Sequence, residues 1–454
     1  MSSNSQPSTL VAQLEARLNS FDSVVRAQAL TELIALVERG EVLLPPERPV
    51  VNMHCHTFFS FNAAGHSPTS LAWMGKRRGF WSMGIVDFDV LDGVDEFLDA
   101  CDLLGLRGSA GIETRVFVPE YADREINSPG EPGVCYQMGI GFASSAVPEA
   151  VAPILADLSR RASERNQAIL ARVNSYLAPV TIDYETDVLP LTPNGHPTER
   201  HLVMAYIQAA QRMLPDPASF WADRLGIART EMDSILADSP RFQTLIRTRL
   251  IKRGGVGYVQ PQSGMFPSLE EFHALVVACG ALPCAAWLDG TSAAEEDPEA
   301  WLEFMIGQGV VALNIIPDRN WNIADPELRR RKVRNLYRVV EVARALDLPL
   351  NVGTEMNSFG QKEVDDFDAP ELAPLRRPFL AGASFIYGHT VMQRILGRGY
   401  MSDWAQSHLP SRQERNEFYR RLGHLVPAGG PGPARLQGLD PDLPPRDILS
   451  RLGE

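Results

Sequence analysis

The chain has 454 residues, of which 44% are hydrophobic and 22% are charged, and its formal net charge is −13. This composition is typical of a soluble globular protein with a sizeable core, and the length suits two or three domains of roughly 150 residues or one large α/β barrel with additions. The acidic balance argues against nucleic-acid polymers and anionic membranes as partners, although a local basic pocket remains compatible with it.

Targeting signals and a disulfide framework are absent from the sequence pattern. No run of about 18 apolar residues occurs, and the first residues lack the charged and apolar regions of a signal peptide. The five cysteines are scattered and form no CxxC pair. These features predict a cytoplasmic protein with reduced thiols.

The first 144 residues divide into a helical segment and an alternating one. Residues 1–47 are predicted to be a helical N-terminal extension, because leucines recur at helical spacing within 8–40 and PPERP then ends the pattern. From residue 48, strands expected at 48–54, 80–89 and 107–118 alternate with helices at 67–79 and 94–105. Such alternation predicts parallel βαβ units, so residues 48–144 are interpreted as the first part of a barrel.

The rest of the chain continues this plan around an interruption. Residues 145–254 are charged, rich in Ala and Leu and without clear strands, which predicts a helical insertion. Residues 255–380 are interpreted as the second part of the barrel, with strands at 256–261, 282–289, 310–316 and 349–357 and helices at 268–280, 298–309 and 325–347. Residues 381–454 are predicted to be a helical C-terminal extension whose Pro/Gly-rich segment, near 426–445, is an extended or flexible arm.

Polar residues stand where the predicted strands end. In parallel α/β sheets and barrels, reactive groups gather at the carboxyl ends of the strands. His54 and His56, two residues apart on a strand, point to the same side. We therefore expect one rim to carry His54, His56, Asp87, Glu113, Trp287, Asn314 and Glu355.

Several motifs in order resemble the PHP (polymerase and histidinol phosphatase) family, in particular its branch of metal-dependent phosphoesterases that act on nucleotides. They are HCHTFFSFN, GIVDFDVLDGVDEF, GIETRVF, TERHLVMAY, the segment KRGGVGYVQPQSGMFPSLEEFHALVVACGALPCAAWLDG, and GTEMN. The resemblance covers roughly residues 50–360. It implies a distorted (β/α)7 barrel, here with a helical insertion and helical ends, and a centre for up to three divalent metals.

The metal-ligand set departs from the family pattern. Positions that would carry ligands hold Phe61, Phe88, Tyr136, Trp287, Glu355 and Asn357. A phenyl ring cannot coordinate a cation, so a three-metal cluster is not expected. His54, His56 and Glu113 could still hold one zinc, manganese or iron ion, because two imidazoles and a carboxylate are a recurrent catalytic donor set. Glu113, Asp87 and Glu355 are the candidate catalytic residues.

Other residues are candidates for binding a small anionic metabolite, such as a phosphorylated sugar or nucleotide. Arg and Lys recognise phosphate and aromatic faces stack on sugars or bases, and the aromatic wall would also include Phe58, Phe61 and Phe88. The predicted substrate-binding residues are His201, Arg200, Arg319, Asn357, Lys362, Trp287 and Tyr136.

Structural explanations stand beside each of these assignments. The two histidines could be hydrogen-bonded scaffolding, Glu113 could pair with Arg115 or Arg319, Asp87 could serve a loop, and the aromatic residues could simply fill the core. The sequence therefore predicts a divergent metal-dependent phosphoesterase, with a non-hydrolytic relative as the alternative: a metabolite-binding protein or an isomerase or lyase on the same barrel. The helical ends could cover the pocket or form the interface of a homo-oligomer, and the sequence leaves both open.

Overall fold

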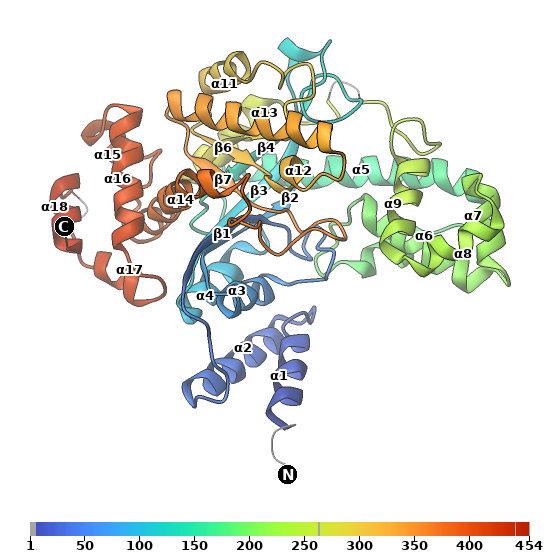
Figure 1. The fold of residues 1–454 in the computed structure, drawn as a ribbon, viewed down its shortest axis with the longest axis horizontal. Coiled ribbons are helices and arrows are strands. Elements are labelled where there is room, and N and C mark those ends of the chain that lie inside the picture. Colours follow the sequence, from blue (N-terminus) through green and yellow to red (C-terminus); the bar gives the residue numbers. More distant parts are fainter. Residues whose placement is uncertain (1–5, 262–263, 441, 454) are drawn as a thin grey trace.

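A seven-stranded sheet forms the centre of the protein (Figure 1). The computed structural model describes residues 6–261, 264–440 and 442–453, so residues 1–5, 441 and 454 of the predicted extensions and 262–263 of the second barrel part lie outside the described residues. The strand order follows the chain, and the sheet curls into a nearly closed barrel. Its strands are β1 (Arg48–Cys55), β2 (Phe80–Phe88), β3 (Arg107–Phe117), β4 (Val134–Ile140), β5 (Leu282–Trp287), β6 (Ala312–Ile315) and β7 (Leu350–Val352).

One strand breaks the expected parallel pattern. Strands β1 to β3 are parallel, as are β5 to β7, but β4 runs antiparallel to both β3 and β5. The connection from β3 to β4 contains only the short helix η1 (Pro119–Tyr121) and no crossover helix, so the chain turns back as a hairpin. The expected parallel units are present in β1 to β3 and in β5 to β7, but the sequence did not predict β4. The strand expected at 256–261 was wrong, because the chain there forms turns around Gly255 and Gly257.

The barrel closes through a single bridge between β1 and the residues after β7. His56 N–H donates to the carbonyl oxygen of Glu355 at 2.7 Å, and Glu355 N–H donates to that of His54 at 2.8 Å. Gly353 permits this approach, because a Cβ there would lie 2.4 Å from the backbone nitrogen of His54. The seam of the barrel thus joins the histidine pair to Glu355.

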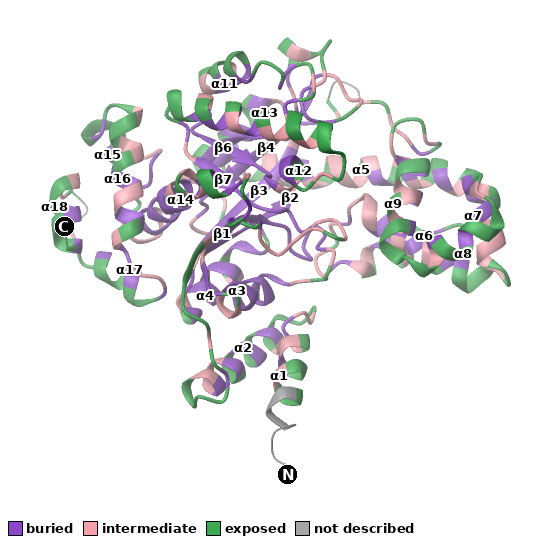
Figure 2. Ribbon diagram, viewed as in Figure 1, coloured by how far each residue is buried: buried purple, intermediate pink, exposed green. Residues whose placement is uncertain are grey.

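Helices cover the outside of the sheet, whose strands are largely buried (Figure 2). Most of them begin with a side-chain cap; Ser67, for example, accepts from the N–H of Ser70 and precedes Pro68. The helices around the barrel are α3 (Pro68–Arg77), α4 (Val94–Leu104), α10 (Leu269–Ala278), α11 (Pro298–Gly307), α12 (Asp318–Trp321), α13 (Pro326–Ala345) and α14 (Arg376–Leu396), the last of these preceded by η5 (Ala373–Leu375).

A helical unit lies between β4 and β5 and extends to the right of the barrel in Figure 1. Its buried side chains, among them Tyr206, Trp221 and Phe242, form a hydrophobic core separate from that of the barrel. It consists of α5 (Ala152–Leu177), η2 (Tyr184–Val188), η3 (Leu189–Leu191), α6 (Glu199–Met213), α7 (Pro217–Leu225), α8 (Arg229–Ala237), α9 (Ser239–Ile246) and η4 (Arg247–Ile251).

Helices also form both ends of the chain. The N-terminal hairpin of α1 (Gln6–Arg17) and α2 (Ser23–Glu38) projects below the barrel in Figure 1. At the other end lie α15 (Asp403–His408), α16 (Arg412–Leu425), α17 (Pro431–Leu436) and α18 (Pro445–Leu452). The segment 426–445, expected as an extended arm, contains α17, whose Leu436 is fully buried in the main core. Within the described residues, every helix is too short or too polar to cross a lipid bilayer.

Candidate metal and anion site

Two histidines and one glutamate converge at the carboxyl end of the barrel strands. His54 and His56 stand at the end of β1, Glu113 lies in β3, and all three are buried. Glu113 Oε2 lies 3.4 Å from His54 Nε2 and 3.1 Å from His56 Nε2, and the three atoms lie within 4.8 Å of one another. None of these atoms has a hydrogen-bond partner among the described residues. The expected trio is therefore assembled.

A pair of asparagines fixes the ring of His54. His54 Nδ1 lies 3.1 Å from Asn314 Oδ1, which also accepts from Asn351 Nδ2 at 2.9 Å. Asn351 Nδ2 donates in addition to the carbonyl oxygen of Met53, which identifies the Asn314 atom as the oxygen. His54 Nδ1 therefore carries the proton, and the lone pair of Nε2 faces Glu113.

The hydroxyl of Ser60 fixes the ring of His56. Ser60 Oγ donates to Asp87 Oδ1 at 2.6 Å, so its lone pair accepts from His56 Nδ1 at 3.1 Å. Asp87 also accepts from the N–H of Thr57 at 2.7 Å and from its hydroxyl at 2.6 Å. Asp87 thus lies behind the loop that follows β1, outside the cavity described below, and does not reach it as its predicted catalytic role requires.

The electrostatics of His54, His56 and Glu113 require a positive charge among their facing atoms. Burial opposes the ionisation of Glu113, but the two histidines outweigh it and lower its pKa to about 2. Burial lowers the pKa of His54, and the interactions with Glu113 outweigh it, so the net direction is upward. Two lone pairs beside an ionised carboxylate repel one another unless protons or a metal ion lie among them. Two imidazoles of fixed tautomer, together with one carboxylate, fit a single divalent ion.

Glu355 adds a second carboxylate beside His54. Glu355 and Met356 both adopt left-handed backbone conformations, with φ of 63° and 55°, which are strained for residues other than glycine. The strain places the Glu355 side chain on the cavity wall. Its Oε2 accepts from Arg319 at 2.8 Å and from Gln361 at 2.9 Å, so Arg319 pairs with Glu355 and not with Glu113.

A cavity of about 900 Å³ lies between the barrel and the helical unit, and Glu113 is part of its lining. Phe61, Phe88 and Tyr136 form an aromatic part of its lining, as expected. Phe88 also stacks on the ring of His56, with centroids 4.4 Å apart. The phenyl ring of Phe88 thus covers one face of the His56 imidazole and offers no atom that could bind a second ion.

Two aromatic residues that the sequence placed on this wall lie elsewhere. Trp287 faces the opposite side of β5, where its neighbour Gly290 and the main core surround it, and Ala286 lines the cavity instead. Side chains alternate between the two faces of a strand, so a shift of one residue places a side chain on the wrong face of the sheet. Phe58 packs in a small separate cluster with Phe59 and Val90.

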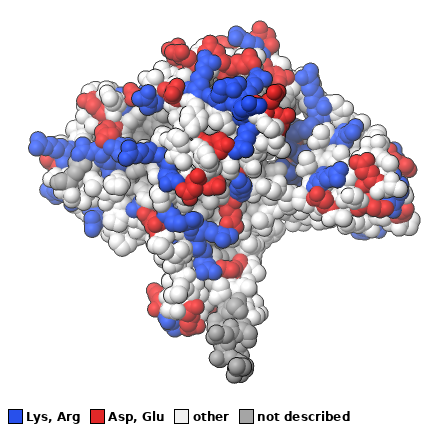
Figure 3. Space-filling model, viewed as in Figure 1, with Lys and Arg blue, Asp and Glu red and all other residues white. Residues whose placement is uncertain are grey.

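Cationic side chains surround the cavity, and Figure 3 shows Lys and Arg beside the hollow between the barrel and the helical unit. Most are paired: Arg115 contacts Glu131, and both Arg247 and Lys252 contact Glu199. We call the lining cations the basic cluster: Arg115, Arg161, Arg165, Arg200, Arg247, Lys252, Arg253 and Arg319.

Arg165 and Arg200 form no ion pair with any described residue. Their guanidinium groups lie over aromatic rings instead, Arg165 over Phe266 and Arg200 over Phe61. Burial lowers the pKa of each to about 10, and a neighbouring cation, Arg115 or Arg247, adds to the shift. Two cations in one cavity that form no ion pair within the described part of the chain favour an anionic ligand.

The remaining predicted binding residues lie at or near this cavity. Asn357 lines it, but His201 and Lys362 do not. His201 Nδ1 accepts from the N–H of Thr198 at the start of α6, its ring contacts Phe61, and burial lowers its pKa to about 4, so the ring is neutral. Lys362 Nζ lies over the ring of Trp321.

Of the residues by which the helical unit lines the cavity, the sequence indicated only Arg200. Arg165 was not singled out, and neither were Arg247 or Lys252. A signal was present in α5, because Arg161 and Arg165 fall on the same helical face as the buried Leu158 and Ile169. Cations on a buried face indicate a polar cavity or an ion pair.

The comparisons with known proteins show likeness in fold only. No protein-family model matches the chain, and no curated protein does. The chain is similar to a solved amidohydrolase from Chromobacterium violaceum with bound sulfate and no metal, at 16% identity and a TM-score of 0.47, over 73% of this chain and 96% of that one. A candidate metal-dependent phosphoesterase from Bifidobacterium adolescentis is similar at 19% identity and a TM-score of 0.46, over 74% and 98%. With TM-scores below 0.5, neither carries an argument, and the chemistry rests on this chain's own residues.

Proposed function

We propose that the protein is a hydrolase that cleaves a phosphoryl ester of a small anionic metabolite with the help of one divalent ion. The observation that supports this most directly is the convergence of three unpartnered ligand atoms from His54, His56 and Glu113. Asn314 and Ser60 fix both imidazoles in the tautomer that a metal ligand needs. A divalent ion bound there would lower the pKa of a water molecule to about 7 and polarise a phosphoryl oxygen.

The chain's own residues would bind and orient the substrate. Arg165 and Arg200 offer unpaired guanidinium groups to its anionic part. Asn314 Nδ2 is a buried donor without a partner among the described residues, and its side chain lines the cavity beside His54. Glu355 is the carboxylate available to take a proton from the attacking water, since Arg319 and Gln361 both bind its Oε2.

A non-hydrolytic relative is the second candidate, and one observation favours it. The aromatic side chains Phe61 and Phe88 line the cavity, and Phe88 stacks on His56, so neither gives an atom for a further metal. A protein of this kind would bind its metabolite in the same cavity, or isomerise or cleave it without hydrolysis, with the histidines and Glu113 as a hydrogen-bonded scaffold.

Metal content and phosphate release separate the two candidates. We expect the purified protein to hold about one equivalent of a transition metal, His54→Ala to lose it, and His424→Ala, at an exposed position on α16, to keep it. Phosphate release from a panel of sugar and nucleotide monophosphates should be lost in Glu113→Gln. Less than about a tenth of an equivalent of metal in the wild type, unchanged in His54→Ala, would refute the proposal.

A further inference from the structure

The N-terminal hairpin contacts the loop that carries Ser60. This loop, residues 56–67, runs from the end of β1 to the start of α3. At its far end, Ser67 donates its hydroxyl to the carbonyl oxygen of Leu18 and its N–H to Asn19 Oδ1 at 3.0 Å. The turn between α1 and α2 is thereby hydrogen-bonded to Ser67, the N-cap residue of α3.

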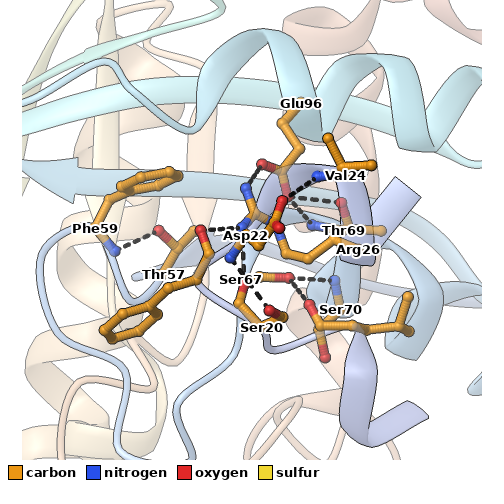
Figure 4. A network of polar contacts seen from close by, with 12 residues as sticks. Ser20, Asp22, Val24, Arg26, Thr57, Phe59, Ser67, Thr69, Ser70 and Glu96 are labelled. Carbon is orange, nitrogen blue, oxygen red and sulfur yellow. Dashed lines mark hydrogen bonds and ion pairs between the residues drawn. The ribbon is translucent and has the colours of Figure 1, made fainter. Parts of the chain in front are cut away.

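Arg26 of α2 forms a second connection, shown in Figure 4. It is only 3% exposed and makes an ion pair with Glu96 of α4, which also accepts from the hydroxyl of Thr69 at 2.6 Å. Its Nη1 donates to the carbonyl oxygens of Ser20 and Phe21. Arg26 therefore fixes the hairpin turn against α3 and α4.

The same arginine contacts the loop directly. Its guanidinium carbon lies 5.2 Å from the centre of the Phe58 ring, and the ring of Phe21 meets Phe58 edge to face at 5.5 Å. Phe58 belongs to a cluster of three residues that is separate from the main core. The hairpin thus supplies an important part of the packing of Phe58.

Phe58 lies between the residues that fix the ring of His56. The hydroxyl of Thr57 accepts from the N–H of Phe59 at 3.1 Å and donates to Asp87, and Ser60, two residues after Phe58, bridges Asp87 and His56. A hydrogen bond to a metal ligand weakens steeply when its partner moves by more than about 0.5 Å. The position of Phe58 therefore bears on the orientation of the imidazole.

We propose that the α1–α2 hairpin is a positioning element for the metal ligand His56, with Arg26 and Phe21 acting through Phe58 and Ser60. The inference rests on the metal site of the proposed function. It gives a role beside the candidate metal site to two helices whose described residues do not line the cavity. Arg26 and Phe21 are positioning residues, since neither touches the ligand atoms.

Zinc affinity, measured by competition with a chromogenic chelator, tests the proposal. Ser60→Ala removes the bond to His56 and should weaken zinc binding about 10- to 100-fold. Arg26→Gln and Phe21→Ala should weaken it about 3- to 10-fold. Phe21 is 52% exposed, so its variant keeps the fold even if Arg26→Gln is unstable. Val24→Ala, 60% exposed on the same hairpin, is the matched control and should bind zinc like the wild type.

The ring ¹⁵N shifts of His56 in the metal-free protein, assigned with His56→Gln, give a readout that does not depend on metal. We expect a single Nδ1-protonated tautomer in the wild type and in Val24→Ala, and a mixture in Ser60→Ala, Arg26→Gln and Phe21→Ala. If Arg26→Gln and Phe21→Ala keep the wild-type shifts, the hairpin only stabilises the fold and the inference is wrong. If the wild type binds no zinc, the proposed function fails, and the shifts alone decide the role of the hairpin.

Discussion

The ring of Phe88 lies almost parallel to that of His56, with the centroids 4.4 Å apart and the planes at 25°. Phe88 ends β2 and Glu113 pairs with it in register across β2 and β3. Phe88 thus covers one face of the His56 ring, and the candidate site is aromatic on that side.

Replacing Phe88 with alanine should weaken the metal site. The loss of the stacked ring frees His56 to turn and admits water to its face, so we expect zinc affinity to fall about 10-fold. Phe88→Tyr keeps the stack and should bind zinc within about twofold of the wild type. Isothermal titration of the metal-free proteins measures both, and equal affinity for Phe88→Ala and the wild type would contradict the role of the stack.

Removal of Arg165 should separate ligand binding from stability. Arg165 forms no salt bridge with any described residue, although Asp89, Glu199 and Glu131 attract it, and it lies close enough to Arg115 for the two cations to repel. We expect Arg165→Met to raise the Kd for inorganic phosphate about 10-fold, which corresponds to about 1.4 kcal/mol, while the melting temperature stays the same or rises.

Arg160 on the same helix provides the control for this prediction. Its side chain is 56% exposed and paired with Asp157 and Glu164, so Arg160→Met should leave phosphate binding unchanged. Unchanged phosphate binding in Arg165→Met, or a clear fall in its melting temperature, would mean that Arg165 serves the fold and not the ligand.

A buried histidine outside the site should make stability depend on pH. His389 is fully buried, its Nε2 donates to the carbonyl oxygen of Gly141 at 3.1 Å, and its Nδ1 accepts from the N–H of Tyr400. Burial lowers the pKa of His389 from 6.5 to about 3. Between these values the unfolded chain binds more protons than the folded one, so this contribution is fully present above pH 6.5 and is lost as the pH falls toward 3.

The size of the effect can be measured by urea unfolding at pH 7.5 and pH 5. His389 should contribute a loss of about 2 kcal/mol at pH 5, because each unit between the two pKa values corresponds to about 1.4 kcal/mol. His389→Gln should remove this part of the pH dependence. His424→Gln, exposed on α16, should retain it, and identical pH profiles for the wild type and His389→Gln would contradict the assignment.

The close approach of Gly353 to β1 at the seam of the barrel predicts that one added methyl group there destabilises the fold. A Cβ on Gly353 would lie 2.4 Å from the backbone nitrogen of His54 and 2.4 Å from Asn52 Oδ1, so β7 must move away from β1. We expect Gly353→Ala to lower the free energy of unfolding by about 2 kcal/mol and to weaken zinc binding. Gly307→Ala, in open space at the end of α11, should do neither. Denaturant unfolding with zinc titration tests both.

The sequence predicted the elements that have a local signature. The strands at 48–54, 80–89, 107–118, 282–289 and 310–316 are present, because short apolar runs bounded by helices carry that pattern locally. The last strand, expected at 349–357, is confined to Leu350–Val352. The sequence did not predict β4, because a hairpin return after η1 leaves no periodic signal. A strand at 256–261 was wrongly expected.

The site was predictable where a motif carried it and unpredictable where two distant segments meet. His54, His56 and Glu113 were expected together, and the structure assembles them. Arg165 required knowledge of how α5 packs over the barrel, and Trp287 was assigned to the wrong face because strand parity depends on register. The path from Arg26 through Phe58 to Ser60 depends entirely on tertiary contacts between segments that carry no common motif.

The separate hydrophobic core of the helical unit has a consequence for how this protein can change. Arg165, Arg200, Arg247 and Lys252 belong to that unit, whereas His54, His56 and Glu113 belong to the barrel. Substitutions that remodel the unit can therefore alter which anion enters the cavity while the reactive groups stay in place. Under the proposed function, the cavity therefore takes part of its cationic lining from one hydrophobic core and its candidate metal ligands from another, and selection can change the first with little effect on the second.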